Sequence, residues 1–381
     1  MRTLGIAMNG VTGRMGYRQH LVRSILAIRE QGGVVLPGGE VLWPEPVLVG
    51  RDADRLRAIA NRHRIERWTT SLDEALADSS VDVYFDAQIT SAREAALKLA
   101  IAAGKHVYSE KPSAGSVAAA LDLARLARDR GIIAGVVHDK LFLPGFIKLK
   151  KLVEANFFGR ILSVRGEFGY WVFEGDLQKS QRPSWNYRAE DGGGIVVDMF
   201  PHWQYILDRV IAPVRSVYAT ASTHIDTRWD ENGHAYAATA DDAAYAILEL
   251  DGGVVAQINS SWAVRVHRDE LVEFQIDGTH GSAVVGLWKC KVQHRTMTPK
   301  PVWNPDVSET HDFRSDWAEL PDNGVFDNAF KAQWEDYLRH VAAGTQTEFD
   351  LFQGARGIQL AEMTLMSVRE GRRIGIPTLS M

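Results

Sequence analysis

Short apolar runs alternate with longer stretches of helical spacing between residues 1 and 140. The runs predict strands, and the stretches, in which apolar residues recur every three or four positions, predict helices. A repeated strand–helix order predicts a parallel, doubly wound α/β sheet. The Gly- and Pro-rich segment 31–46 reads as an inserted loop. The predicted strands are 3–8, 46–50, 81–88, 106–110 and 132–139, and the predicted helices are 15–30, 52–63, 91–104 and 117–131.

The pattern changes after Pro144, where longer strand-like segments are joined by hairpin signals such as Asp251-Gly252-Gly253. These segments predict a large, mainly antiparallel sheet, with helices at 146–156 and 194–209 covering one face. Helical spacing returns from 325 to the C-terminus. We therefore predict a Rossmann domain over 1–143 and a second α/β domain over 144–381, which would include the C-terminal helices. The predicted strands of the second domain lie within 162–173, 214–225, 242–250, 253–264 and 270–278.

Composition and charge exclude several classes of protein. The 381 residues carry a formal net charge of −5, which argues against a general nucleic-acid or anionic-membrane surface. The single cysteine, Cys290, cannot form an intrachain disulfide. No apolar run approaches the ~18 residues that a membrane span needs. We expect a cytoplasmic protein with no metal site and no nucleic-acid or membrane partner.

The segment that follows the first predicted strand contains Gly10, Gly13 and Gly16. In such a turn the first glycine permits the bend, the second lets the backbone approach a pyrophosphate, and the third lets the helix pack on the sheet. Phosphates then lie at the helix N-terminus, where free N–H groups favour anions. The sequence predicts a dinucleotide here, with Thr12, Arg14 and Met15 beside it.

The end of the second strand, Gly50-Arg51-Asp52, leaves the choice of cofactor open. Arg51 suits the 2′-phosphate of NADP, but it could equally stack on adenine while Asp52 reaches the ribose of NAD. Further cofactor contacts are expected after the later strands, from Gln88, Glu110 and Lys111, because ligands bind at the carboxyl ends of parallel strands.

Two further motifs carry candidate chemistry. Lys111 lies in "GKHVYSEKPSAGS" (104–116), directly after a strand, where an ammonium group can stabilise a developing alkoxide. Asp198 and His202 are four residues apart in "EDGGGIVVDMFPHWQYILDRV" (190–210), which places them on one face of a helix. A carboxylate beside an imidazole can hold its tautomer and stabilise the imidazolium.

Together these motifs resemble the glucose–fructose oxidoreductase / inositol dehydrogenase / MocA family. The family pattern Gly-Lys-His-Val-x-x-Glu-Lys-Pro is matched at 104–112, and the family's Gly-Gly-Gly-x-x-x-Asp-x-Gly-x-His is matched at 192–194, Asp198 and His202. The resemblance covers nearly the whole chain. It implies that Lys111, Asp198 and His202 occupy the catalytic positions and face the nicotinamide of NAD, with NADP as the other choice.

The chain departs from the family pattern near these positions. Phe200 replaces the glycine before the histidine, Pro201 lies inside the predicted helix, and Tyr205 replaces an acid that often follows the histidine. The family's Thr-Pro-Asn-x-x-His is here "QITSAR", with Gln88, Thr90 and Arg93, and its Asn-x-Arg-Phe is "HDKLF", with His138 and Lys140. A different substrate from the family's usual ones is therefore expected.

By this resemblance the leading chemistry is hydride transfer from a secondary hydroxyl of a sugar, polyol or glycoside, expected at C3. His202 would act as general base, Lys111 would stabilise the oxyanion, and Asp198 would hold the imidazole. One alternative is a redox-assisted glycosidase, which oxidises C3, eliminates the aglycone, adds water and reduces the product. Another is a dinucleotide-sensing regulator without turnover.

The expected pocket rim combines aromatic rings and cations. Tyr170, Trp171, Trp185, Tyr187 and Trp203 offer flat apolar faces for a sugar ring, with Tyr205 on the catalytic helix. Arg182, Arg188, Arg265, His267 and Arg268 suggest an anionic substrate such as a carboxylate or sulfonate, because arginine grips such groups through two hydrogen bonds. The resemblance also implies that the second domain, 144–381, binds the substrate and supports oligomerisation. A homodimer or homotetramer would form through the exposed face of the large sheet.

Overall fold

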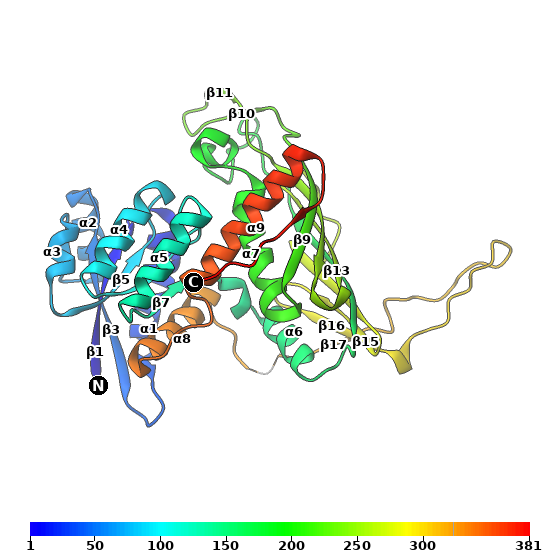
Figure 1. The fold of residues 1–381 in the computed structure, drawn as a ribbon, viewed down its shortest axis with the longest axis horizontal. Coiled ribbons are helices and arrows are strands. Elements are labelled where there is room, and N and C mark those ends of the chain that lie inside the picture. Colours follow the sequence, from blue (N-terminus) through cyan, green and yellow to red (C-terminus); the bar gives the residue numbers. More distant parts are fainter. Residues whose placement is uncertain (323) are drawn as a thin grey trace. The chain divides into compact units, whose positions relative to one another are not determined.

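The structure is a computed structural model that describes residues 1–322 and 324–381 and divides into two compact units (Figure 1). The first unit contains Met1–Phe142, Phe326–Gln359 and Leu379–Met381, and the second contains Leu143–Val325 and Leu360–Thr378. Residues 326–359, which the sequence analysis placed in the second domain, thus belong to the first unit. The long helix α9 (Leu351–Glu370) begins in the first unit and ends in the second.

The first unit is built on the parallel sheet that the alternating pattern predicts. Its strand order is β2-β3-β1-β5-β6-β7, with β4 beside β3, and all pairs are parallel except β2 with β3. The strands are β1 (Arg2–Asn9), β2 (Val34–Val35), β3 (Val41–Val49), β4 (Trp68–Thr69), β5 (Val81–Asp86), β6 (His106–Ser109) and β7 (Ala134–Val136).

Helices cover both faces of this sheet because alternate strand residues enter two separate cores. Leu4, Ile6 and Met8 of β1 belong to the core shared with η1, α2 and α8, whereas Ala7 joins the core of α3, α4, α5 and the start of α9. This is the doubly wound arrangement. The helices are η1 (Gly16–Leu26), α1 (Ala27–Glu30), α2 (Ala53–His63), α3 (Leu72–Ala77), α4 (Thr90–Ala102), α5 (Val117–Asp129), η2 (Asp139–Phe142) and α8 (Ala329–Ala343).

The prediction of a loop over 31–46 was wrong, because β2 and most of β3 lie within this segment. Pro44 and Pro46 misled the interpretation, since proline cannot donate to a ladder. On its outer side β3 pairs with β2 only near Val41 and with β4 only near Leu48. The prolines therefore occupy a stretch with one free edge, which tolerates a missing N–H.

The second unit contains a nine-stranded sheet of order β17-β16-β15-β14-β8-β13-β12-β9-β18 and a separate two-stranded ribbon, β10-β11. In the large sheet only β8 and β13 pair in parallel, so the prediction of a mainly antiparallel sheet is confirmed. The strands are β8 (Ile161–Gly169), β9 (Val214–Ser222), β10 (Thr227–Trp229), β11 (Ala235–Ala237), β12 (Ala243–Leu250), β13 (Val255–Ser261), β14 (Val272–Gly278), β15 (Gly281–Val285), β16 (Cys290–His294), β17 (Ala318–Glu319) and β18 (Ile374–Gly375).

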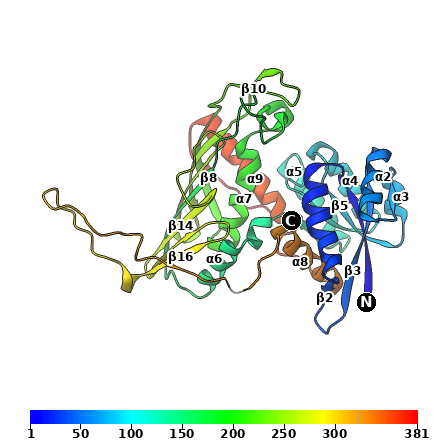
Figure 2. The same cartoon turned by 180° about the vertical axis from the view of Figure 1, so that it is seen from behind.

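One face of the nine-stranded sheet is covered by α6 (Pro144–Glu154), α7 (Ile195–Ile206) and the second half of α9 (Figures 1 and 2). Phe146 packs edge-on against Phe274, and Trp203 donates from Nε1 to the Ser260 hydroxyl at 2.9 Å. The opposite face presents exposed apolar side chains, among them Tyr218, Tyr245 and Ile247. The remaining short helices are η3 (Ser184–Tyr187), η4 (Ala189–Asp191), η5 (Leu207–Ile211), η6 (Asp251–Gly253) and η7 (Arg295–Met297).

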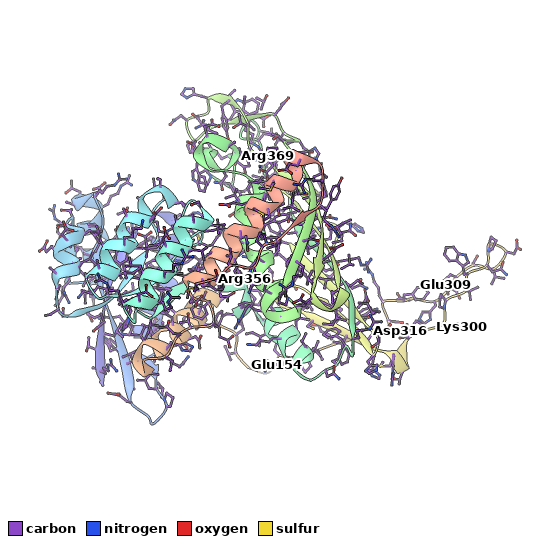
Figure 3. All side chains as sticks on the ribbon, viewed as in Figure 1. Glu154, Lys300, Glu309, Asp316, Arg356 and Arg369 are labelled. Carbon is purple, nitrogen blue, oxygen red and sulfur yellow. The ribbon has the colours of Figure 1, made fainter. Side chains whose placement is uncertain are left out.

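Residues 298–317, between η7 and β17, form a long excursion away from the nine-stranded sheet, on which Figure 3 labels Lys300, Glu309 and Asp316. The Glu309 carboxylate accepts from the backbone N–H groups of Val302 and His311, which ties the two limbs together. Among the described residues, no helix is both long enough and apolar enough to cross a bilayer.

Candidate active site

The carboxyl ends of the parallel strands place most of the predicted cofactor residues at one edge of the first unit's sheet. Val49, Asn9, Asp86, Ser109 and Val136 are successive register partners across β3, β1, β5, β6 and β7. The glycine turn, Arg51, Gln88, Glu110 and Lys111 directly follow these residues. Parallel α/β sheets bind their ligands at this edge.

The three glycines meet different surroundings. Gly10 has φ +88°, and a Cβ there would lie 2.5 Å from the carbonyl carbon of Ala87. A Cβ on Gly16 would lie 2.4 Å from the carbonyl oxygen of Gly10, so the helix η1 approaches the turn as closely as glycine allows. These positions match the first and third roles assigned from the sequence.

Gly13 differs from the other two because it faces outward. Its N–H donates to the Gly10 carbonyl at 3.0 Å and closes the turn. A Cβ at Gly13 would meet only that carbonyl oxygen, at 3.3 Å, and Gly13 and Arg14 are exposed, while Thr12 and Met15 are half-buried. A pyrophosphate needs such an open backbone at a helix start, so these residues fit the group.

Asp52 has a structural role that the sequence left open. Its Oδ1 accepts from the backbone N–H of Arg55 at 3.0 Å, so Asp52 is the N-cap of α2. Its Oδ2 lies 3.3 Å from Nε of Arg55. Arg51 is exposed at the end of β3.

A buried polar network that motif analysis missed joins the strand ends. Asp86 accepts from Tyr84 OH at 2.7 Å, from Gln88 Nε2 at 2.8 Å and from Arg93 Nε at 3.0 Å. Arg93 also donates to the carbonyl oxygen of Pro112. Burial and the adjacent Asp86 raise the pKa of Tyr84, so its hydroxyl remains a donor. Gln88, predicted to contact the cofactor, turns its amide toward Asp86, and Arg93 braces the loop that carries Lys111.

Glu110 is buried beside Lys111 and is held by a second network. Its Oε1 lies 2.9 Å from Nε2 of His20, and its Oε2 accepts from the backbone N–H of Lys111 at 3.1 Å. Burial alone would raise the pKa of Glu110, but the hydrogen bond from His20 and the nearby Arg93 and Lys111 bring it below its usual value. Glu110 therefore anchors the loop as a carboxylate.

In the second unit, Asp198 and His202 lie on α7, which begins where Asp241 accepts from the N–H of Val196 at 2.8 Å. Asp198 is paired with Arg182, whose Nη1 donates to Oδ2 at 2.8 Å. Arg182 also donates to Tyr170 OH at 3.2 Å and lies over the Trp262 ring at 4.3 Å. Arg182, expected to bind a substrate anion, is thus engaged by the predicted catalytic carboxylate.

His202 is buried, and its Nδ1 lies 2.7 Å from the hydroxyl of Tyr205. The residues are three positions apart, so they share a face of α7. Tyr205 is thus a buried neighbour of the imidazole that can orient the ring, a role that the sequence analysis predicted for Asp198. Pro201 lies inside the helix, and Phe200 and Trp203 are fully buried.

Only some of the aromatic side chains predicted at the pocket rim are exposed. Trp171 is half-buried beneath the guanidinium of Arg265, which lies 4.1 Å from its ring centre, and Trp185 is exposed. Tyr187 is buried between Arg228, 3.9 Å over its ring, and Trp262. Burial raises the pKa of Tyr187 to about 12. Tyr187 therefore lies in the core of this unit and is not part of an exposed rim.

Two of the other predicted cations, Arg188 and Arg268, also have protein partners. Arg188 lies over the ring of Tyr236 at 4.3 Å and 3.9 Å from Asp191. Arg268 donates to the carbonyl oxygens of Gly169 and Leu271 at 2.7 and 2.9 Å. Arg265 and His267 are exposed.

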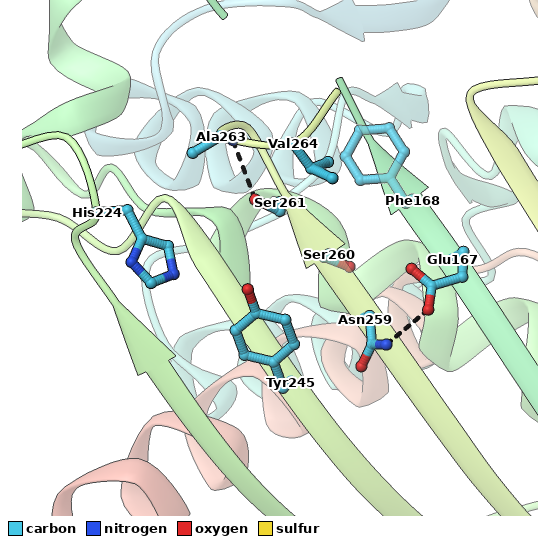
Figure 4. A pocket seen from close by; sticks show the side chains of 9 residues that line it. All are labelled: Glu167, Phe168, His224, Tyr245, Asn259, Ser260, Ser261, Ala263 and Val264. Atoms are coloured by element: carbon cyan, nitrogen blue, oxygen red, sulfur yellow. Dashed lines mark hydrogen bonds between the residues drawn. The ribbon is translucent and has the colours of Figure 1, made fainter. Parts of the chain in front are cut away.

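A hollow of about 360 Å³ lies on the second unit's sheet, over β8, β12 and β13 (Figure 4). Asn259 donates to Glu167 across its floor at 2.6 Å. It contains none of the predicted catalytic residues and is lined by Glu167, Phe168, His224, Tyr245, Asn259, Ser260, Ser261, Ala263 and Val264.

Comparison with known proteins identifies relatives of the whole chain. A D-xylose dehydrogenase of Paenarthrobacter nicotinovorans is 58% identical over 380 residues, which cover 99% of this chain and 98% of that protein. The levoglucosan dehydrogenase of Pseudarthrobacter phenanthrenivorans is 24% identical over 265 residues, 64% of this chain and 66% of that protein. A solved levoglucosan dehydrogenase in complex with NADH and L-sorbose has the same fold, with a TM-score of 0.81, 19% identity and complete coverage of both chains.

Two family profiles match most of the chain. Residues 5–138 match the profile described as "Oxidoreductase family, NAD-binding Rossmann fold", and residues 146–284 match the "GFO/IDH/MocA C-terminal domain". The first unit therefore carries an NAD-binding Rossmann domain, as the glycine turn predicted. The chain belongs to the Gfo/Idh/MocA family of oxidoreductases.

Proposed function

We propose that this protein is an NAD-dependent sugar dehydrogenase whose substrate is a neutral aldose of the D-xylose type. The observation that carries the proposal is the 58% identity to a D-xylose dehydrogenase over 99% of the chain. The NAD-binding domain and the residues retained at the predicted catalytic positions, Lys111, Asp198 and His202, support the same chemistry.

When bound, the nicotinamide supplies the hydride acceptor for such an oxidation. His202 takes the hydroxyl proton at Nε2, because the hydroxyl of Tyr205 engages Nδ1 and orients the ring. Lys111 stabilises the developing oxyanion with its ammonium group. Asp198 forms an ion pair with Arg182, which places a pair of opposite charges one helical turn before His202.

The protein contacts of these arginines favour a neutral sugar over the anionic substrate that their cluster in the sequence suggested. Arg182 is paired with Asp198, Arg188 lies against Asp191 and Tyr236, and Arg268 binds backbone carbonyls. A guanidinium that already donates to protein oxygens has fewer N–H groups for a carboxylate or sulfonate. We therefore place D-xylose ahead of a glucuronide or sulfoquinovoside.

Three finer expectations remain proposals: oxidation at C3, the glycosidase alternative, and a regulator without turnover. One experiment separates them. The protein is incubated with NAD and D-xylose, glucuronate or a nitrophenyl xyloside, and NADH and released nitrophenol are followed separately. A dehydrogenase accumulates NADH with free sugar. A redox-assisted glycosidase releases nitrophenol without net NADH, and a regulator gives neither. Identification of the oxidised sugar shows which carbon reacted.

A homo-oligomer is proposed through the outer face of the nine-stranded sheet, with a second copy of this chain as the occupant. Tyr218, Tyr245, Ile247 and Val255 are all exposed on neighbouring strands β9, β12 and β13. Contiguous apolar residues of this kind mark interaction surfaces. A symmetric pair would cover the same patch on both copies.

A further inference from the structure

Helix α8 reaches the loop of Lys111 through a chain of three buried side chains. Nε1 of Trp334 donates to Nδ1 of His20 at 3.0 Å, and Nε2 of His20 lies 2.9 Å from Oε1 of Glu110. Trp334 and His20 are both fully buried. Trp334 and His20 are 314 positions apart in the sequence, so only the fold brings these groups together.

The chemistry of the two outer groups fixes where the proton of His20 lies. An indole N–H can only donate, so Nδ1 of His20 must be the acceptor and carries no proton. A carboxylate can only accept, so Nε2 must carry the proton and donate it to Glu110. The imidazole is therefore held as one neutral tautomer, with each nitrogen assigned by its partner.

Glu110, held by His20, in turn binds the backbone of the loop that carries Lys111. Its other oxygen accepts from the backbone N–H of Lys111, and its own N–H donates to the carbonyl of Asp86 at 2.9 Å. The carboxyl group that His20 holds therefore fixes the Lys111 amide, and the Asp86 carbonyl fixes the Glu110 amide one residue earlier. A rotation of the Glu110 side chain would release the peptide that positions Lys111.

Gln333, the residue before Trp334, contacts the segment that follows β7. Gln333 accepts from the N–H of His138 at 2.9 Å through Oε1 and donates from Nε2 to the carbonyl of Val136 at 2.9 Å. Consecutive residues of α8 therefore hold the segments that follow β6 and β7. This explains why α8 belongs to the first unit, although it follows the second in sequence.

We propose that Trp334 and His20 are positioning residues for the reaction: the indole N–H locks the Nε2–H tautomer of His20, which holds Glu110 and thereby fixes the peptide that carries Lys111. This inference rests on the proposed function, in which Lys111 stabilises the oxyanion. It assigns a role in turnover to a C-terminal helix that lies outside both regions matched by the family profiles.

The direct test is the ¹⁵N spectrum of histidine-labelled wild-type protein, with the His20 signal assigned by its loss in His20→Gln. The inference requires the neutral Nε2–H form across neutral pH. A neutral Nδ1–H form, a tautomer mixture or a doubly protonated ring would overturn it, whatever any variant does.

The functional test is Trp334→Phe, which keeps an aromatic ring beside Tyr108 and removes only the N–H donor. Trp303→Phe, at a side chain 99% exposed in the excursion 298–317, is the matched control. Loss of one hydrogen bond corresponds to a change of about five- to tenfold. We expect kcat with D-xylose to fall by that factor in Trp334→Phe, with NADH affinity and the KM for the sugar within about twofold, and no change in Trp303→Phe.

Equal kcat in folded Trp334→Phe and wild type would overturn the inference, as would a loss that appears only in NADH affinity. Lys111→Ala separates this failure from a failure of the proposed function. If Lys111→Ala turns over D-xylose normally, the proposed function is wrong. If Lys111→Ala is inactive while Trp334→Phe is fully active, only the positioning role is wrong.

Discussion

Gly10, Gly13 and Gly16 share a motif, yet their surroundings assign them separate tasks. Gly10 and Gly16 allow close backbone approach within the turn, and Gly13 leaves an exposed backbone at the helix start. Their spacing in the sequence was sufficient to predict the turn and its ligand, because the steric demand is local.

Gly16→Ala and Gly13→Ala should therefore have different effects. The Cβ added by Gly16→Ala would lie 2.4 Å from a backbone oxygen, so we expect a loss of about 2–4 kcal/mol in the free energy of unfolding. Gly13→Ala should change stability by less than about 1 kcal/mol and weaken NADH binding by crowding the phosphates. Urea unfolding and NADH titration measure the two effects. Equal destabilisation by both substitutions would contradict these roles.

Glu110 gives a prediction about acid stability. Its pKa in the folded protein is below the ordinary value of 4.5, so the unfolded chain binds the proton more tightly. The carboxylate therefore contributes stability above pH 4.5, and this contribution is lost as the pH falls through the folded pKa. Glu110→Gln has no such proton to bind.

The difference in unfolding free energy between wild type and Glu110→Gln should accordingly shrink as the pH is lowered from 7 through 4.5. Urea denaturation at a series of pH values measures it. A difference that stays constant, or grows toward acid, would show that Glu110 is not held as a carboxylate.

Single residues also mark the limit of sequence reasoning at the site. Lys111 and His202 could be named because each lies in a local motif. His20 and Trp334 could not, since their partners are distant in sequence. Asp86 could not either: its partners are near in sequence, but no spacing rule connects them. Arg182 and Tyr187 were named for a surface role, but burial and protein partners were visible only in the structure.

At the scale of elements, α7 is the feature that joins Asp198, His202 and Tyr205. The helical spacing predicted that Asp198 and His202 share a face, and Tyr205, a departure from the family pattern, lies beside the histidine. By contrast, most of β3 was predicted as a loop because Pro44 and Pro46 lie within it. The strand can form because the stretch that contains them has no paired strand on its outer side.

Tyr205→Phe tests the pairing on α7. The ring remains in the core, but Nδ1 of His202 loses its hydroxyl partner. We expect kcat to fall by about tenfold, with the affinity for NADH unchanged. Trp203→Phe, on the same helix turn but bonded to Ser260, is the control for packing. Full turnover in Tyr205→Phe would show that Tyr205 does not orient the general base His202.

At the scale of the whole molecule, the chain crosses between the two units three times from Val325 onward, at Phe326, Leu360 and Leu379. Sequence patterning showed where the α/β alternation stops, but it could not show that 326–359 returns to the first unit. That return depends on long-range contacts such as Gln333 with His138 and Trp334 with His20.

The outer face of the nine-stranded sheet leads to a prediction about assembly. Ile247→Lys places a charge at a side chain that is 51% exposed in the middle of the apolar patch. We expect light scattering to show a smaller species than wild type at equal concentration, with unchanged secondary structure. Val35→Lys, at an exposed position of the first unit, should leave the mass unchanged. An oligomer unaffected by Ile247→Lys would place the interface elsewhere.

The central claim is that this chain transfers hydride from a neutral sugar to NAD. It is tested most directly by kcat/KM for D-xylose with NAD, compared under one salt condition with glucuronate and with NADP, and repeated with Lys111→Ala and His202→Ala. The account predicts NADH formation with D-xylose, lower efficiency with the anionic sugar and with NADP, and losses of about 10²–10⁴-fold in each variant. Absence of NADH with D-xylose, or full activity in either variant, would contradict it.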